Sequence, residues 1–354
     1  MMEKETLLTI LAEKGPFENE DDETACRELV EELSPDEEEA AAQTSFAYFE
    51  ATQLRQDLQF LSTEDNDDDE GKNDTTTATA LDKTKLQQQF AMREARRHYI
   101  GEDRNAERAL HSLREALSLR SELRVNLVRF IPLAAHEEAF DNLTVLSDAE
   151  KAVVRTFRAQ VEQEFPRQYT ITGGLDVDRS AVVVRFPRLT SETDVDGYLT
   201  TLLYVTERAL AATEYYSTGR QEKVLALSEY LDYNSANAPP IWSLKDSVLK
   251  LQHMYPERLK KMILTDPPFW MRALYNLLFP LLSKSTVDKV SMTSGASEKE
   301  TVLTELIGDN VPKSLPLLQE DWSISSDSID IEQYLNQPMY QTHSPLESSP
   351  ACQE

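Results

Sequence analysis

Residues 244–290 read LKDSVLKLQHMYPERLKKMILTDPPFWMRALYNLLFPLLSKSTVDKV, a stretch that joins three patterns. An amphipathic helical pattern ends at Tyr255-Pro256-Glu257-Arg258-Leu259, and a short apolar strand pattern, Met262-Ile263-Leu264, follows it. Phe269–Leu282 is then apolar on almost every side of a helix. Such a helix must be buried, lie in a membrane or cover an apolar cavity. The stretch therefore predicts a helix, a buried strand and a second, unusually apolar helix.

Short β-branched or apolar runs recur on both sides of this stretch. Ala181–Val184 and Val224–Leu227 precede it, and Val290–Thr293 lies at its end. Apolar residues at helical spacing separate the runs, at Tyr198–Ala212 and Ile241–Leu259. Runs this short and apolar are typical of strands buried on both faces. Strands that alternate with helices predict an α/β fold with a mainly parallel β-sheet flanked by helices.

The residues before the first strand are helical in pattern. Apolar residues recur at helical spacing from Leu81 to Phe130, and a second helical stretch runs from His136 to Phe165. We expect a small N-terminal helical domain at residues 81–135 and the α/β domain at residues 136–318.

The acidity of the chain lies at its two ends. The net charge is −27, of which −19 falls in residues 1–80, with 24 acidic and 5 basic side chains. Residues 319–354 hold 7 acidic side chains and no basic ones, so the middle of the chain is almost neutral. Acidic, polar segments are typical of disorder. We therefore expect residues 1–80 to be a mostly disordered tail and residues 319–354 to be a second one. Within the first, Phe46–Leu61 is expected to form a transient helix, with a helix that docks on another part of the protein as the alternative.

Composition also excludes several classes of protein. Strong acidity argues against nucleic acid as a partner, because phosphates demand clusters of Lys and Arg. The two cysteines, Cys26 and Cys352, both fall in the expected tails and form neither a disulfide framework nor a metal-ligand spacing. No segment has the shape of a signal peptide, and no apolar run reaches the roughly 18 residues needed to span a bilayer. We expect a soluble cytoplasmic protein that has no metal and no cofactor.

The order and spacing of several motifs resemble the CRAL-TRIO lipid-binding domain, the fold of the phosphatidylinositol/phosphatidylcholine transfer proteins. The most specific is Tyr255-Pro256-Glu257-Arg258-Leu259. The others are Asp178–Val184, Glu207-Arg208-Ala209, Asn237–Pro240, Asp266-Pro267-Pro268-Phe269, Thr286–Val290 and Asn310–Lys313, with a looser match at Phe90–Leu117. The resemblance implies a small helical domain followed by a sheet that holds a lipid in an apolar cavity beneath a helical lid.

The resemblance also implies which residues contact the ligand. Glu257 and Lys289 match positions near the inositol headgroup in phosphatidylinositol-binding members, and Arg96-Arg97 is the nearest match to a basic pair that joins that site. A Lys presents a compact charge to phosphate, and a carboxylate accepts hydrogen bonds from inositol hydroxyls. Val224 and Ala226 stand where members that also hold phosphatidylcholine carry hydroxyl side chains, so the sequence does not favour phosphatidylcholine.

Phe269–Leu282 matches the gating helix of the family. The resemblance implies a lid that swings to admit a lipid and contacts the bilayer when open. Exposing several large apolar side chains together costs many kcal/mol in water, at about 25 cal/mol per Å2, so a closed lid must hide them and a membrane can accept them. The expected lid and membrane contacts are Phe269, Trp270, Leu274, Leu277, Leu278 and Phe279.

Catalysis is poorly supported, because the five histidines show no pairing with a nucleophile in a recognisable motif and no Gly-rich phosphate loop is present. We expect a protein that is not an enzyme, that binds a phospholipid, in the first place phosphatidylinositol, and that transfers or presents it at membranes. Two alternatives remain open: the same fold holding another hydrophobic ligand (retinoid, tocopherol or sterol-like), and an interaction adaptor with a vestigial pocket. Protein partners are expected for the acidic tails.

Overall fold

The structure is a computed structural model, and it divides into two compact units between Glu122 and Leu123. It describes residues 17, 19–45, 83–135, 137–172, 178, 180–185, 187, 195–217, 221–230, 233, 238 and 240–307. The division falls earlier than the boundary at residue 135 expected from the sequence, because the short helices after Leu123 pack with the second unit.

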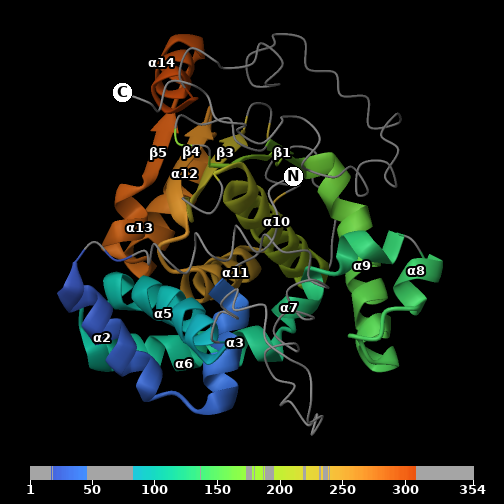
Figure 1. The fold of residues 1–354 in the computed structure, drawn as a ribbon. Helices are drawn as coiled ribbons and strands as arrows, with labels where there is room; N and C mark the ends of the chain where they lie inside the picture. The colour runs from blue at the N-terminus through green and yellow to red at the C-terminus, as the bar shows by residue number, and fades with distance from the viewer. Residues whose placement is uncertain are drawn as a thin grey trace, which may run out of the picture. The chain divides into compact units, whose positions relative to one another are not determined.

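The first unit is helical, and its helices α2, α3, α5 and α6 lie against one another (Figure 1). They span Glu20–Glu31 (α2), Pro35–Ser45 (α3), Lys83–Gly101 (α5) and Ala106–Glu122 (α6). Their core gathers apolar side chains from all four helices, among them Cys26, Leu29, Ala41, Phe90 and Leu113. The helical spacing of these residues explains why each helix buries one side.

Two of these helices correct the expectation of disorder at residues 1–80. The Asn19 side chain accepts a hydrogen bond from the Asp22 amide at the start of α2, and Ser34 and Glu37 cap α3 reciprocally. Acids in the first turn of each helix also interact favourably with the helix dipole. For residues 20–45 the prediction of disorder is therefore wrong. The candidate helix at Phe46–Leu61 and the tail at residues 319–354 lie outside the described residues.

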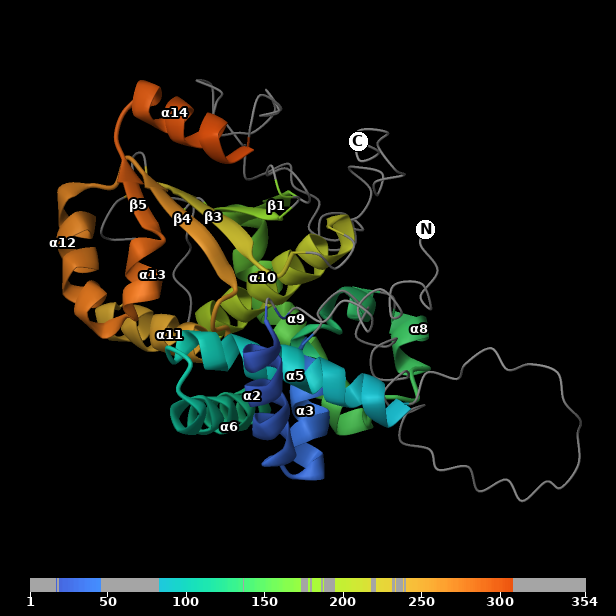
Figure 2. The same ribbon diagram turned by 60° about the vertical axis from the view of Figure 1, so that its left-hand side comes forward.

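The second unit contains a five-stranded sheet in the order β1-β2-β3-β4-β5 (Figure 2). β1 pairs antiparallel with β2, and the other pairs are parallel. The strands span Tyr169–Thr172 (β1), Val182–Arg185 (β2), Val224–Glu229 (β3), Leu259–Thr265 (β4) and Val290–Thr293 (β5). The helical elements are Val125–Val128 (α7), Ile131–Ala135 (η1), Glu137–Asp141 (α8), Asp148–Gln168 (α9), Val195–Tyr216 (α10), Ile241–Met254 (α11), Phe269–Leu278 (α12), Phe279–Leu281 (η4), Lys284–Asp288 (α13) and Ala296–Ile307 (α14).

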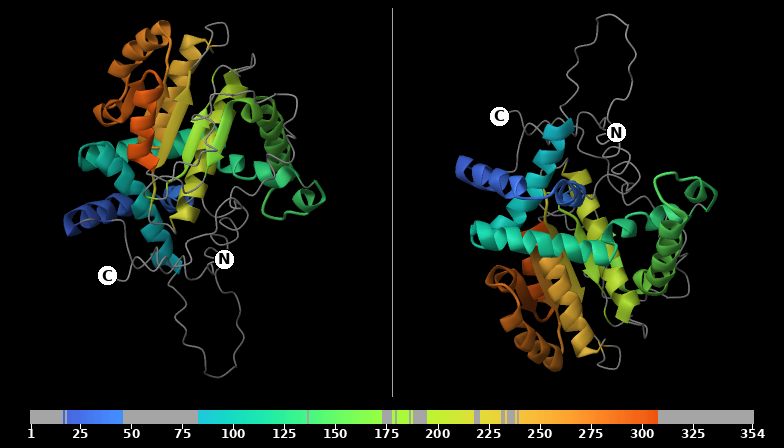
Figure 3. Two further views of the ribbon diagram at one scale, coloured as in Figure 1. Left: turned by 90° about the horizontal axis from the view of Figure 1, so that it is seen from above. Right: turned by 90° about the horizontal axis from the view of Figure 1, so that it is seen from below.

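Helices lie on both faces of this sheet and beside its two outer strands, β1 and β5. Figure 3 shows α9 beyond the β1 edge and the orange helices α12 and α13 at the β5 edge. Leu303 of α14 packs on one face, with side chains that include Val182, Leu227 and Ile263. Met271 of α12 joins a separate cluster that includes Leu264 and Met292. Alternate residues of the parallel strands therefore bury in two different cores, as expected for strands covered on both sides.

The predicted α/β class and mainly parallel sheet are confirmed, as are the four apolar strands. β1 was not expected, because Tyr169–Thr172 follows α9 directly and no turn residue announces it. The predicted helix at Ile241–Leu259 ends earlier, at Met254. Within the described part of the chain, no helix combines the length and the hydropathy that crossing a bilayer requires.

Candidate functional site

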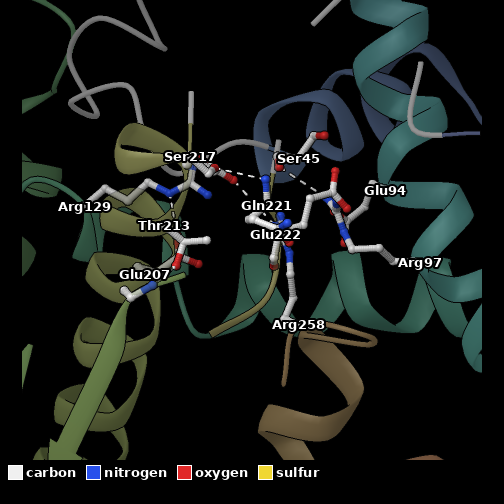
Figure 4. A network of polar contacts seen from close by, with 12 residues as sticks. Ser45, Glu94, Arg97, Arg129, Glu207, Thr213, Ser217, Gln221, Glu222 and Arg258 are labelled. Carbon is white, nitrogen blue, oxygen red and sulfur yellow. Dashed lines mark hydrogen bonds and ion pairs between the residues drawn. The ribbon is translucent and has the colours of Figure 1, made fainter. Parts of the chain in front are cut away.

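The Tyr-Pro-Glu-Arg motif forms the turn between α11 and β4, and its side chains diverge. The Tyr255 hydroxyl donates to Glu207 Oε1 of α10 over 2.7 Å, and Arg258 lies 3.5 Å from Glu214 Oε1 of the same helix. Figure 4 shows Glu207 and Arg258 among the polar contacts of this unit. Glu257 stands between these two anchors in the left-handed region, with a φ of 56°. The two flanking contacts to α10 thus fix the turn that presents the Glu257 carboxylate.

Glu257 is the centre of a group of charges that we name the amino-edge cluster: Lys223, Glu257, Ser285 and Lys289. Lys289 Nζ donates to Glu257 Oε2 over 2.9 Å, so the two residues that the sequence resemblance assigns to the headgroup are in contact. Lys223 Nζ lies 3.2 Å from the same oxygen, and the Ser285 hydroxyl donates to Oε1 over 2.8 Å. The carboxylate therefore accepts hydrogen bonds from three side chains, two of them cationic.

The cluster keeps Glu257 ionised. Partial burial acts to raise its pKa, but hydrogen bonds from Lys289 and Ser285 and the charges of both lysines outweigh burial and lower the pKa from 4.5 to about 2. The side chain of Glu257 is 15% exposed, Lys289 20% and Lys223 43%. The glutamate is therefore the most enclosed of the three charged members, and Lys223 the one most open to solvent.

Parallel strand pairing explains why these residues meet. Lys223 precedes β3, Glu257 lies two residues before β4, and Lys289 precedes β5. The Val224 amide donates to Arg258 O and the Met262 amide donates to Lys289 O, so the three strand starts are adjacent. Amino ends of neighbouring parallel strands share one edge of a sheet. Lys223 and Ser285 were missed in the sequence, although the position of Lys223 immediately before a predicted strand was a usable signal.

Arg96 and Arg97 lie in the first unit, on α5. Arg97 is almost fully buried, donates to the Ser45 carbonyl at the end of α3 and forms an ion pair with Glu94. Arg96 is partly buried. The sequence resemblance assigns Arg96 and Arg97 to the ligand site, and this assignment stays a prediction.

α12 is more amphipathic than its sequence suggested. Phe269 is 87% exposed and Leu277 is 63% exposed, whereas Leu278 is buried. Trp270, Leu274 and Phe279 are partly buried. The helix therefore buries one side and presents large apolar side chains on the other. The sequence predicts that a closed lid hides these side chains, but in the structure Phe269 and Leu277 are exposed. The role of these residues as a lid, and the apolar cavity beneath it, stay predictions.

Tyrosines mark the buried side of α12. The hydroxyls of Tyr275 and Tyr230 lie 3.0 Å apart, and the Tyr233 ring contacts both Tyr230 and Trp270. Burial raises the pKa of Tyr230 and that of Tyr275, so both hydroxyls stay protonated and able to donate. A neutral hydrogen bond thus joins α12 to the segment that follows β3.

A second group of charges lies at the opposite edge of the sheet, and we name it the carboxyl-edge cluster: Glu229, Asp266 and Lys299. Lys299 Nζ of α14 lies 2.7 Å from Glu229 Oε2 and 3.0 Å from Asp266 Oδ2. The Gly295 amide also donates to Asp266 over 2.8 Å. Burial acts against the charge on Lys299, but hydrogen bonds to the two carboxylates dominate and raise its pKa. The cluster ties α14 to the ends of β3 and β4.

Among the described residues, no group of three or more His, Cys, Asp or Glu side chains is arranged to hold a metal ion. Both clusters are instead built from carboxylates paired with lysines.

Comparison with known proteins gives a family match over the part of the chain that contains these strands and motifs. Residues 167–315 match the family model described as "CRAL/TRIO domain". No curated protein matches the chain. One similar solved structure, described as "Crystal structure of Sfh5", is 14% identical with a TM-score of 0.41, and the match covers 61% of this chain and 67% of the Sfh5 chain. The family match spans β1 to α14, including the turn at Glu257. Residues 167–315 of the chain are therefore similar in sequence to the CRAL/TRIO domain.

Proposed function

We propose that the chain binds a phospholipid, with phosphatidylinositol as the expected ligand, in an apolar cavity beneath α12, and that it transfers or presents the lipid at membranes. The CRAL/TRIO domain supports the coarser part of this proposal, binding of a lipid or another small hydrophobic ligand. The headgroup chemistry and the exchange at a membrane are inferred from this chain's own residues.

The contact between Lys289 and Glu257 carries the proposal. It brings together a cation and a carboxylate at a partly open edge of the sheet, at 2.9 Å. An ammonium group can bind the phosphate of the lipid, and a carboxylate can accept hydrogen bonds from the hydroxyls of an inositol ring. The low pKa of Glu257 keeps its acceptor oxygens available throughout the physiological pH range. Headgroup recognition therefore needs no change in protonation.

The exposed side of α12 supports contact with a bilayer. Phe269 and Leu277 present large apolar side chains to water, and such side chains gain free energy when they enter an apolar phase. α12 also starts and ends at turns, after Pro268 and at η4, so it is a discrete segment. In the proposed mechanism α12 inserts these side chains at the membrane surface, moves away from the sheet and admits the acyl chains.

Lipid extraction tests the ligand. The purified full chain is incubated with vesicles that contain phosphatidylinositol and other phospholipids, re-isolated and analysed by native mass spectrometry. We expect bound phosphatidylinositol in the original chain and at least a tenfold lower occupancy in Lys289→Ala, since one charged hydrogen bond contributes about 1.5–3 kcal/mol. Lys245→Ala, which removes an exposed lysine of α11, is the matched control.

Other results would redirect the proposal. A bound retinoid, tocopherol or sterol-like molecule, or binding that is indifferent to Lys289, would favour a different hydrophobic ligand. A chain that stays empty after exposure to vesicles would favour an interaction protein.

Transfer between vesicles tests the part assigned to α12. We expect Phe269→Ser and Leu277→Ser each to slow phosphatidylinositol transfer several-fold while the folded protein keeps its lipid. Trp242→Ser is the control, because Trp242 is also exposed, at 62%, but belongs to α11. Equal slowing by all three substitutions would show that general surface hydrophobicity, rather than α12, governs membrane contact.

A further inference from the structure

Lys223 also belongs to the amino-edge cluster. A headgroup contact through Lys289 alone does not explain why a second lysine lies there. Its ammonium group shares Glu257 Oε2 with Lys289, at 3.2 Å and 2.9 Å, while Ser285 donates to the other oxygen. Three donors from two separate segments, Lys223 before β3 and Ser285 and Lys289 at α13, therefore converge on one anionic group. Lys223 and Ser285 lie outside every motif that carried the family resemblance, so the resemblance assigns them no role.

The charges of the cluster are not balanced by the glutamate. Two ammonium groups and one carboxylate leave a net charge of +1. A phosphodiester carries one negative charge, whereas a phosphomonoester carries about −1.5 to −2 at pH 7 and offers three acceptor oxygens. A phosphomonoester in the position of the carboxylate would neutralise both lysines and give each of the three donors its own oxygen. The donor set therefore matches a phosphomonoester better than a phosphodiester.

The amino-edge cluster is accessible from solvent. Lys223 is 43% exposed and Lys289 20% exposed, so the cluster is open on the Lys223 side. Glu257 is held in the left-handed region at a φ of 56°, which costs energy for a residue with a side chain. The surrounding structure therefore enforces a strained turn that places the carboxylate between the lysines. A long, flexible glutamate side chain can leave this position by rotation about its own bonds.

We propose that Lys223, Lys289 and Ser285 form a binding site for a phosphomonoester, which Glu257 fills while the site is empty, and that the lipid headgroup this chain prefers is therefore a phosphorylated inositol. This inference rests on the proposed function and names its ligand class more narrowly. Lys289 serves any inositol phospholipid, and Lys223 adds the preference for the phosphorylated one.

Binding to vesicles of defined composition tests the inference. Phosphatidylcholine vesicles contain either phosphatidylinositol or phosphatidylinositol monophosphate, and the full chain is compared with Lys223→Met, Lys223→Arg and the control Lys245→Met. We expect Lys223→Met to weaken binding of the phosphorylated lipid about tenfold, with phosphatidylinositol binding within twofold of the original and Lys223→Arg largely restored. Thermal unfolding of each variant shows that it is folded.

A soluble headgroup separates the two sources of a phosphomonoester. Inositol monophosphate that competes with the lipid in the original chain, but about tenfold less well in Lys223→Met, shows that the phosphate itself is the recognised group; lipid binding without such competition shows that the membrane-borne form is required. Either result supports the site. Equal effects of Lys223→Met on both lipids, or none on either, overturn the inference but leave the proposed function standing if Lys289→Ala still loses phosphatidylinositol. If the original chain binds neither lipid, both proposals fail.

Discussion

The two edges of the sheet carry charge clusters of opposite design. The amino-edge cluster sets two lysines around one glutamate, and the carboxyl-edge cluster sets two carboxylates around one lysine. At the carboxyl edge Glu229 is almost completely buried and Lys299 nearly so, whereas Lys223 at the amino edge is close to half exposed. A buried ion pair is strongly destabilised when one partner is lost, and an exposed pair contributes little. The same kind of contact therefore holds the fold together at one edge and leaves charge accessible to a ligand at the other.

The largest loss of stability should follow Lys299→Met. This substitution removes the ammonium group between Glu229 and Asp266, and the buried carboxylate of Glu229 loses the cation 2.7 Å away. We expect the free energy of unfolding to fall by about 3 kcal/mol. Urea unfolding measures it, with Lys245→Met as a control for loss of an exposed lysine. A change as small as that of the control would show that the two edges do not differ in the way described.

The second-largest loss of stability should follow acidification, which acts on the amino-edge cluster through Glu257. The pKa of Glu257 is lowered to about 2 in the folded chain from an ordinary 4.5, so its contribution to stability is present above pH 4.5 and is lost as the pH falls toward 2. We expect this contribution to be about 2 kcal/mol, after allowance for partial exposure.

Unfolding by urea at several pH values between 5 and 3 measures that contribution. In Glu257→Gln the dependence on pH should become shallower in this range, whereas Glu138→Gln, an exposed glutamate of α8, should leave it unchanged. An identical pH dependence in Glu257→Gln and the original chain would contradict the assigned role of the carboxylate.

A smaller loss of stability is expected when the hydrogen bond between Tyr230 and Tyr275 is removed. Tyr275→Phe removes one hydroxyl of the buried pair and leaves the Tyr230 hydroxyl without it, at a cost of about 1 kcal/mol. The double variant with Tyr230→Phe should cost less than the sum of the two single substitutions, because no buried hydroxyl then loses its partner. Additive losses in the same unfolding measurements would show that the two hydroxyls do not interact.

The smallest effect on stability is expected for Lys223→Met. The lysine is close to half exposed, and Glu257 keeps Lys289 and Ser285 as partners. We expect the free energy of unfolding to change by less than about 0.5 kcal/mol. A loss comparable with that of Lys299→Met would make Lys223 a structural residue and remove the contrast between the edges.

The sequence predicts most of the sheet because its parallel strands are buried on both faces. Continuous apolar runs such as Val182–Val184 have no other good explanation in a chain of this charge. β1 escapes notice because Tyr169–Thr172 is short, alternates polar and apolar residues and lies at an edge. α2 was missed because its acidic residues dominate the composition, although Cys26, Leu29 and Val30 lie on its buried side. The many acidic residues of such a helix reflect its solvent-exposed side, whereas the helical spacing of its few apolar residues reveals its buried side.

The candidate site could be predicted only in part. Glu257 and Lys289 are 32 residues apart, and the family resemblance alone joined them. The structure brings them into contact, and their role at a headgroup stays a prediction. Lys223 and Ser285 depend on which strand starts are neighbours and on where a short helix falls before β5. Strand order is a property of the whole sheet, and no local pattern near Lys223 encodes it. Side chains that meet across several strand ends are therefore the part of a site that sequence reasoning finds last.

The start of α12 has a mechanical consequence. Pro267 and Pro268 each fix φ, and Asp266 before them is held by the Gly295 amide and by Lys299. The proposed opening of α12 would therefore resemble the swing of a beam clamped at its start, about 15 Å long for its 10 residues, once Tyr275 and Leu278 leave their buried contacts. Displacement of a clamped beam grows with distance from the clamp, so a tilt that hardly moves Phe269 carries Leu277 through the widest arc. In the proposed opening, Phe269 would serve as the pivot and Leu277 as the moving tip.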